Sequence, residues 1–315
     1  KDIALYPDSL GYIFSGSALV DKDNTTGFQT GEEKPLVAVF THHNPDGGLQ
    51  TQSIAYSTDA GKSWKKYKKN PVLENLGIKD FRDPKVFWHD KTSKWIMVLA
   101  AGDHVRFYSS PDLKDWTLES KFGENAGAHG GVWECPDLFP LALDGDGQNK
   151  KWVLLVSINP GAPNGGSGTQ YFVGEFNGHR FTNETKKNQW IDYGTDNYAG
   201  VTWSNTPRRK IFIGWMNNWA YADQIPTSTW RGSMTLPRKL TLKRVAGKPR
   251  LISTPVREIK ALKQEVFSLE NKSISQNPLN KECIEVDLNE ALLQFNMVTG
   301  NAGGMIIRLY NSQEE

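Results

Sequence analysis

Two short segments carry acidic residues in settings that suit acid–base chemistry. Asp83 lies in Arg82-Asp83-Pro84 and Glu134 lies in Glu134-Cys135-Pro136, and each segment stands where a β-like stretch begins. The proline of each segment restricts the backbone as the chain enters that stretch. A lone tripeptide of either kind is better explained by local structure, such as an Arg–Asp ion pair in a turn. The two segments begin successive repeats of the chain, described below, and this recurrence favours one site shared by both carboxylates.

Two carboxylates that converge on a narrow channel disfavour one another's ionisation, so one of the pair is expected to hold a proton near neutral pH. Carboxylates of unequal pKa suit the cleavage of a glycosidic bond, where one protonates the leaving oxygen and another faces the anomeric carbon. The 11 tryptophans, among them Trp133, Trp203, Trp215 and Trp219, offer faces for stacking on sugars. Most tryptophans in β proteins are core residues, so their number is compatible with sugar binding but does not by itself indicate it.

The elements that must position these residues form a repeat of about 50 residues. Each copy contains three β-like segments, and the copies occupy residues 14–64, 82–116, 133–178 and, less regularly, 198–242. Short strands repeated at this period are typical of the blades of a β-propeller. Because a blade starts at its innermost strand, Asp83 and Glu134 are both predicted to reach the central axis.

The fold class predicted for the whole chain is all-β. Helical periodicity is almost absent up to residue 257, and apolar alternation is broken by Gly, Asn and Asp corners. The corners at 57–64 and 109–116 are assigned to scaffolding, since their Ser and Asp side chains can bind the turn backbone. We predict a propeller domain over residues 1–257 and, over residues 258–315, a linker and a truncated β-sandwich with strands at 283–288 and 305–310.

Composition excludes several other classes of protein. The chain has 37 Lys and Arg against 35 Asp and Glu, a net charge of +2, and scattered basic residues, so no nucleic-acid partner is predicted. No apolar stretch approaches the roughly 20 residues of a membrane-spanning helix.

No cofactor or metal site is predicted either. The Gly-rich stretch 160–168 lacks the Lys-Ser/Thr ending of a phosphate loop and is interpreted as a connector between strands. Residues 144–148 lack the Glu of a calcium loop and are interpreted as a polar hairpin. Cys135 and Cys283 fall in different predicted domains, so no disulfide is expected between them.

Seven segments in order along the chain resemble glycoside hydrolase family 32, the fructan hydrolases that include invertases, exo-inulinases and levanases. They are Ile3-Ala4-Leu5-Tyr6-Pro7-Asp8, Phe14-Ser15-Gly16-Ser17-Ala18, Arg82-Asp83-Pro84, Glu134-Cys135-Pro136, residues 192–199, residues 214–219 and Leu236-Pro237-Arg238. The resemblance implies a five-bladed propeller followed by a β-sandwich, and retaining hydrolysis of terminal β-fructofuranosyl bonds.

Carried over residue by residue, the resemblance makes Glu134 the general acid/base. It makes Asp83 the transition-state stabiliser, which grips fructose hydroxyls together with Arg82. The substrate-binding set it implies also contains Phe14, Ser15, Ser17, Cys135, Tyr193, Asp196 and Trp219.

The chain departs from the family pattern at the nucleophile. In the family this residue is the Asp of an Asn-Asp-Pro motif upstream of Ala-Leu-Tyr-Pro, and no Asn-Asp-Pro occurs in the 315 residues. We therefore expect the first of five blades to be largely missing and the sequence to be part of a longer chain. Without a nucleophile the covalent intermediate cannot form, so little or no turnover is expected of these residues alone.

The predicted activity of the complete enzyme is release of terminal β-D-fructofuranosyl units from inulin, levan or sucrose. Polymeric fructans as substrates imply an extracellular or periplasmic location. A non-catalytic fructan-binding module and a related five-bladed arabinanase or xylosidase are the alternatives. A sialidase would need several arginines around the sugar carboxylate, whereas the starts of the inner strands supply only Arg82.

Overall fold

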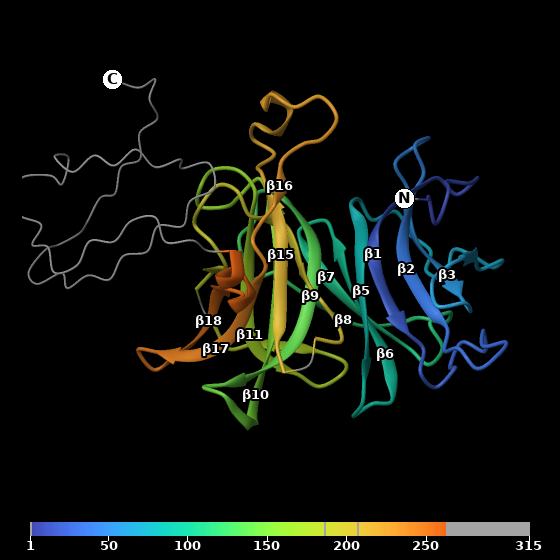
Figure 1. The fold of residues 1–315 in the computed structure, drawn as a ribbon, viewed down its shortest axis with the longest axis horizontal. Coiled ribbons are helices and arrows are strands. Elements are labelled where there is room, and N and C mark those ends of the chain that lie inside the picture. Colours follow the sequence, from blue (N-terminus) through green and yellow to red (C-terminus); the bar gives the residue numbers. More distant parts are fainter. Residues whose placement is uncertain (1, 186, 207, 263–315) are drawn as a thin grey trace, which may run out of the picture. The chain divides into compact units, whose positions relative to one another are not determined.

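The computed structural model describes residues 2–185, 187–206 and 208–262 (Figure 1). The chain divides into two units, Lys1–Val256 and Arg257–Glu315. The first unit is built from strands, with a 3-10 turn η1 (Ala222–Gln224) in the long insertion between β15 and β16. In the second unit, η2 covers Arg257–Leu262, and the strands predicted at 283–288 and 305–310 lie outside the described residues.

The first antiparallel sheet contains β1 (Tyr12–Val20), β2 (Leu36–His43), β3 (Gln50–Ser57) and β4 (Lys65–Lys66), in that order. Apolar residues alternate along β2 and β3 and enter a core shared with the second sheet; the fully buried ones are Val37, Val39 and Ile54. Alternation of this kind is what a strand half-covered by a neighbouring sheet requires.

The second antiparallel sheet contains β5 (Phe81–His89), β6 (Lys94–Ala101), β7 (His104–Ser110) and β8 (Thr117–Phe122). Its strand β6 is buried along nearly its whole length, because sheets cover both of its faces. This explains why the sequence of β6 is a continuous apolar run instead of an alternating one.

A ten-stranded sheet contains the third and fourth predicted repeats. The third supplies β9 (Val132–Leu143), β10 (Asp146–Asn159), β11 (Gly168–Phe176), β12 (Phe181–Asn183) and β13 (Gln189–Trp190). The polar hairpin predicted at 144–148 is confirmed as the β9–β10 turn. The predicted connector between strands lies between β10 and β11.

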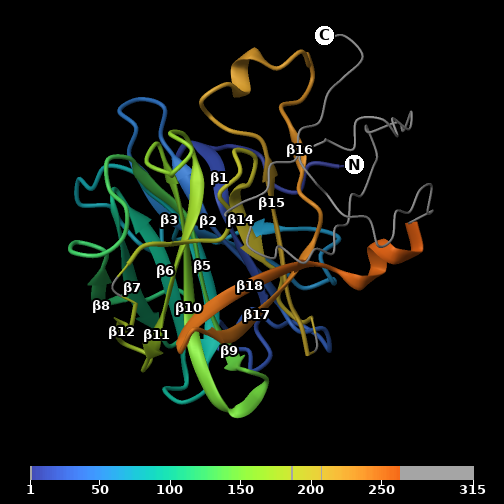
Figure 2. The same ribbon diagram turned by 90° about the vertical axis from the view of Figure 1, so that its left-hand side faces the viewer.

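The fourth repeat supplies β14 (Tyr198–Thr202), β15 (Lys210–Met216), β16 (Ser233–Met234), β17 (Arg238–Val245) and β18 (Lys248–Pro255). The third and fourth repeats share this sheet because β17 pairs in parallel with β9 through Leu242 and Leu143. Both leucines are buried in one apolar cluster, which explains the joining of the two repeats. Figure 2 shows the β17–β18 hairpin, in orange, beside β9 and β10.

The corner after β3 has the scaffolding role predicted for it. Asp59 accepts hydrogen bonds from the backbone N–H and hydroxyl of Ser63 and from the hydroxyl of Ser57. These hydrogen bonds, the one from the Ser63 hydroxyl above all, lower the pKa of Asp59. At the corner after β7, Asp112 likewise accepts from the backbone N–H of Lys114 and of Asp115.

A β-bulge interrupts the first strand of each repeat. The shifts in pairing fall between Ile13 and Gly16 in β1, between Arg82 and Lys85 in β5, between Glu134 and Asp137 in β9, and between Tyr198 and Val201 in β14. A bulge inserts an extra residue and re-aims the side chains around it. The bulged residues include three with positive φ: Asp83 (64°), Cys135 (48°) and Ala199 (53°).

Gly16 stands at the β1 bulge because the facing strand comes too close for any side chain. A Cβ at this position would lie 2.0 Å from the carbonyl oxygen of Val39. We predict that Gly16→Ala lowers the free energy of unfolding by about 1–3 kcal/mol, measured by urea denaturation, since the strands must separate to admit the methyl group. A Cβ at Gly31 would meet no atom within 4 Å, so Gly31→Ala is the control; equal effects of both variants would contradict the explanation.

Candidate active site

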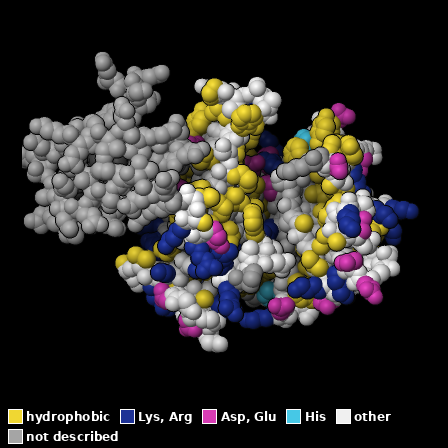
Figure 3. All heavy atoms as spheres, viewed as in Figure 1, with side chains coloured by type: hydrophobic (Ala, Val, Ile, Leu, Met, Phe, Trp, Pro, Cys, Tyr) yellow, Lys and Arg dark blue, Asp and Glu magenta, His cyan; other side chains and the backbone are white. Residues whose placement is uncertain are grey.

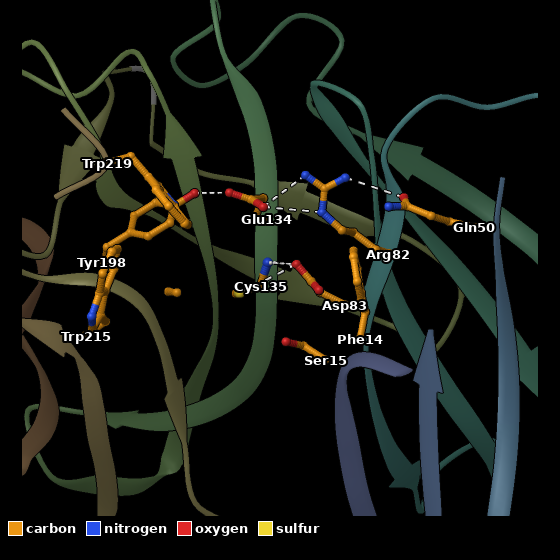
Figure 4. Close-up of a pocket in the computed structure, with 11 residues that line it drawn as sticks. Phe14, Ser15, Gln50, Arg82, Asp83, Glu134, Cys135, Tyr198, Trp215 and Trp219 are labelled. Atoms are coloured by element: carbon orange, nitrogen blue, oxygen red, sulfur yellow. Dashed lines mark hydrogen bonds and ion pairs between the residues drawn. The ribbon is translucent and has the colours of Figure 1, made fainter. Parts of the chain in front are cut away.

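A cavity of about 450 Å³ opens where the bulged strands meet (Figure 4). Its lining residues are Phe14, Ser15, Gln50, Arg82, Asp83, Glu134, Cys135, Tyr198, Ala199, Trp215 and Trp219. Each of β1, β5, β9 and β14 contributes two consecutive residues at its bulge. The prediction that Asp83 and Glu134 meet in one cavity is confirmed.

Glu134 is held by donors on both of its oxygens. Arg82 donates from Nη2 (2.9 Å) and Nε (3.3 Å) to Oε1, and the hydroxyl of Tyr198 donates to Oε2. Arg82 also donates from Nη1 to Asp80 at 2.6 Å, so its guanidinium is fixed from two sides. Figure 4 shows Glu134 between Arg82 and Tyr198, which come from strands on opposite sides of it.

The charges around Arg82 and Tyr198 keep both groups protonated. Burial acts to lower the pKa of Arg82, but its partners Asp80 and Glu134 outweigh this and raise it. Burial raises the pKa of Tyr198, and the charge of Glu134 raises it further. Both groups are therefore hydrogen-bond donors to Glu134 near neutral pH.

Asp83 is the more deeply buried of the two carboxylates, with 9% of its surface exposed. Its Oδ2 accepts from the backbone N–H of Cys135 at 3.0 Å and from the Cys135 thiol at 3.5 Å. Burial raises the pKa of Asp83; the hydrogen bond from Cys135 opposes the rise, and the charge of Glu134 adds to it. Burial and, to a smaller extent, the charge of Glu134 thus disfavour the ionisation of Asp83.

The Cys135 thiol stays protonated beside Asp83. Burial raises the pKa of Cys135 well above its ordinary value, and the charges of Asp83 and Glu134 contribute in the same direction. A neutral thiol can donate a weak hydrogen bond, whereas a thiolate would repel the carboxylate. Cys135 is a free thiol, and Cys283 lies outside the described residues.

Aromatic rings line part of the cavity wall. The Trp215 and Trp219 rings lie 5.2 Å apart at 59°, and Phe14 stacks on His43 with 4.5 Å between ring centroids. Trp133, considered for stacking on sugars, is a core residue with no exposed surface. Trp203 is half exposed but lies outside the cavity lining.

Three residues of the predicted substrate-binding set do not line the cavity. The Ser17 hydroxyl donates to Pro84 O and accepts from Val86 N, both at 2.9 Å, so it joins β1 to β5. Tyr193 is 72% exposed, and Asp196 accepts a hydrogen bond from the hydroxyl of Tyr221. Phe14, Ser15, Arg82, Cys135 and Trp219 lie in the cavity as expected.

Four lining residues were absent from the predicted set: Gln50, Tyr198, Ala199 and Trp215. Tyr198 begins the fourth repeat, at the place before the bulge that Arg82 and Glu134 occupy in theirs, so the repeat could have revealed it. Asp83 stands one place later in its repeat, as Cys135 and Ala199 do in theirs. Gln50 begins β3, and its Oε1 accepts from Arg82 Nη1 at 3.4 Å. No local motif marks Gln50.

Among the described residues, no group of three or more His, Cys, Asp and Glu side chains could hold a metal ion. Within the same residues, no helix combines the length and the apolar character needed to cross a bilayer. On the face shown in Figure 3, Lys and Arg side chains are interspersed with Asp and Glu.

A buried ion pair joins three of the strands that line the cavity. Lys85 Nζ of β5 lies 3.2 Å from Asp137 Oδ1 of β9, and it donates to the backbone carbonyl of Thr202 in β14 at 3.1 Å. Thr202 in turn donates its N–H and hydroxyl to Asp137 Oδ2. Each of these residues lies two to four positions after a cavity residue on its own strand.

We predict that Asp137→Ala lowers the free energy of unfolding by about 3–5 kcal/mol, because it leaves the Lys85 ammonium buried without its counter-charge. The double variant Lys85→Met/Asp137→Leu is expected to lose less stability, since the Lys85 ammonium is removed together with its counter-charge. Urea denaturation of the whole gene product measures both effects. A single variant as stable as the wild type would show that the pair carries no such role.

The raised pKa of Asp83 implies that its charge costs stability. A carboxyl with a raised pKa in the folded state binds protons more tightly there than in the unfolded chain. The free energy of unfolding therefore falls as the pH rises from the pKa that Asp83 has in the unfolded chain to its higher pKa in the folded protein. We predict that Asp83→Asn, which keeps an acceptor for Cys135 N–H, is more stable than the wild type above that interval.

Urea denaturation at a series of pH values measures this effect. The advantage of the Asn variant should vanish in acid, below the ordinary pKa of a carboxyl group, where the wild-type Asp83 is protonated in both states. A variant less stable than the wild type at neutral pH would overturn the interpretation.

The whole first unit matches a known family. The family model described as "Glycosyl hydrolases family 32 N-terminal domain" matches residues 1–255. A levanase of Bacillus subtilis (strain 168) is 54% identical over 278 residues, which cover 87% of this chain and 41% of the levanase. An extracellular exo-inulinase of Aspergillus awamori is 40% identical over 330 residues, which cover 92% of this chain and 61% of that protein.

Solved structures agree with these matches. The exo-inulinase of Aspergillus awamori has a TM-score of 0.72 at 42% identity, over 78% of this chain and 53% of that one. A fructofuranosidase from Schwanniomyces occidentalis, complexed with fructose, has a TM-score of 0.75 at 40% identity, over 81% of this chain and 51% of that one. The chain thus spans about half the length of these relatives. On the family match and these similarities, the chain belongs to glycosyl hydrolase family 32.

Proposed function

We propose that the chain forms part of a retaining glycoside hydrolase that releases terminal β-D-fructofuranosyl units from inulin, levan or sucrose. The observation that carries this proposal is the convergence of Glu134 and Asp83 on one cavity, with Arg82 against Glu134. Membership of the family and the fructose held by a solved relative support the choice of sugar.

In this mechanism Glu134 is the general acid/base. It gives its proton to the glycosidic oxygen as the bond to the fructosyl carbon breaks, and later takes a proton from the water that replaces the leaving group. Arg82 and Tyr198 orient the Glu134 carboxyl group through its two oxygens. Asp83, fixed by Cys135, offers an acceptor to the fructose hydroxyls and stabilises the positive charge that develops on the sugar.

A retaining mechanism also needs a nucleophile, and a third carboxylate would have to supply it. Among the described residues that line the cavity, the carboxylates are Asp83 and Glu134. We therefore propose that the 315 residues alone show little or no turnover. The same observation favours the second candidate function, a fructan-binding module that does not cleave its ligand.

We also propose a finer description of the fold. The antiparallel sheets would be blades of a five-bladed propeller over residues 1–257, whose first blade is largely missing from these residues. The start of a β-sandwich would follow over residues 258–315. The recurrence of one bulge in the inner strand of each repeat supports the propeller. An extracellular or periplasmic location is proposed from the polymeric substrates and from relatives named as extracellular.

Replacing Glu134 by Gln in the whole gene product tests the activity. The variant should lose about 10²–10⁴-fold in kcat on inulin, levan or sucrose, because an amide cannot transfer the proton. Binding of fructose, measured by calorimetry, should persist. Glu119→Gln is the control, since Glu119 is also a partly buried carboxylate that accepts from a hydroxyl and lies outside the cavity.

Undiminished hydrolysis by the Glu134 variant would reject its assignment as the acid/base. Fructo-oligosaccharide binding without cleavage by the wild-type gene product would instead establish the binding module. Arabinan, offered in parallel with inulin, would reveal an arabinanase.

A further inference from the structure

We propose that Thr41 and Gln52, two buried residues of the first sheet, are positioning residues for Asp83. Neither lines the cavity, so neither touches the sugar. The proposed effect on catalysis rests on the function proposed above, whereas the proposed effect on the conformation of Asp83 does not.

The bulge in β5 leaves the backbone of Asp83 outside the regular ladder. Arg82 pairs with Ala100 and Lys85 with Val98, so Asp83 has no partner residue in β6. Asp83 is also a non-glycine residue with a φ of 64°. Such a conformation persists only where the surroundings enforce it, and a buried N–H without an acceptor costs stability.

Thr41 supplies the missing acceptor. Its Oγ1 accepts the backbone N–H of Asp83 at 3.2 Å. Cys135 N–H, from β9 on the other side, fixes the Asp83 carboxylate. The backbone and the side chain of Asp83 are thus held from two different sheets.

Gln52 sets the direction of the Thr41 hydroxyl. Its Oε1 accepts from Thr41 Oγ1 at 2.7 Å, and its Nε2 donates to Phe81 O at 2.8 Å. Because the hydroxyl proton is given to Gln52, a lone pair of Thr41 remains for Asp83 N–H. The amide also holds the chain two residues before Asp83.

Burial makes this chain of hydrogen bonds rigid. Thr41 and Gln52 have no exposed surface, and they face each other as a cross-strand pair of β2 and β3. Water cannot replace a lost partner there without a cavity to hold it. The first sheet therefore holds the backbone that carries the Asp83 carboxylate, in a place from which Cys135 N–H can bind it.

Thr41→Val in the whole gene product tests the proposal, because valine keeps the shape of threonine and removes the hydroxyl. We expect kcat on inulin to fall about 100-fold, as for a catalytic group displaced by about 1 Å. Thr41→Ser keeps the hydroxyl and should restore most of the activity. Gln52→Met, which removes the amide, should lower kcat in the same direction and serves if Thr41→Val does not fold.

Thr26→Val is the matched control. Thr26 is 2% exposed, accepts the backbone N–H of Phe28, and donates to Asp21, so it has the same chemistry away from the cavity. Removal of the Thr26 hydroxyl should lower the melting temperature and leave kcat unchanged. Equal kcat values for Thr26→Val and Thr41→Val, or a Thr41→Ser variant as slow as Thr41→Val, would overturn the proposal.

A crystal structure of Thr41→Val separates this proposal from the proposed function. We expect the backbone of Asp83 to adopt a negative φ in the variant, and the hydrogen bond from Cys135 N–H to the Asp83 carboxylate to break. If the wild type does not hydrolyse fructans, the proposed function fails, and this structure still decides whether Thr41 positions Asp83. An Asp83 unchanged in the variant would refute the positioning role.

Discussion

The β-bulge that recurs in β1, β5, β9 and β14 is the constraint on which the cavity depends. Consecutive residues of a regular strand point to opposite faces, so only one of each pair would reach a common cavity. A bulge lets two neighbours face the same side. Arg82 and Asp83, and likewise Glu134 and Cys135, therefore act in one space. The energetic cost is positive φ at Asp83 and Cys135, which the hydrogen bond between these two residues helps to offset.

The charges at the cavity are unevenly paired, because several carboxylates share one cation. Three carboxylates, Asp80, Asp83 and Glu134, lie around a single guanidinium, that of Arg82. Arg82 forms direct hydrogen bonds with Asp80 and Glu134. Asp83 instead receives neutral donors from Cys135, and burial raises its pKa. Groups whose pKa is perturbed by burial and by specific charges are typical of functional sites, which is why this cluster stands out from the surface ion pairs.

The sequence predicted what depends on local pattern and missed what depends on long-range contacts. The pairs Arg82-Asp83 and Glu134-Cys135 are recognisable in the sequence because each begins a repeat and is followed by a proline, and Tyr198-Ala199 begins the fourth repeat in the same way. Gln50 could not be found, since its contact with Arg82 is made across two sheets. Ser17 was included with its motif, although a strand places its side chain against β5 and away from the cavity. The parallel pairing of β17 with β9 likewise has no local signal, because it arises from a shared apolar cluster.

The cavity has two chemically different walls, and this asymmetry supports a hydroxylated sugar as the ligand. Arg82 and Asp83 supply the charged groups beside β5, next to the ring of Phe14, whereas Trp215 and Trp219 lie on the opposite side of Glu134 (Figure 4). A polar wall with one fixed cation and one buried acceptor can bind neighbouring hydroxyls, and an aromatic wall can cover the less polar face of a ring. Glu134 stands between the two walls and can reach a bond that lies across them. A purely apolar ligand would leave the acceptor of Asp83 unpaired, and an anionic ligand would meet the charge of Glu134.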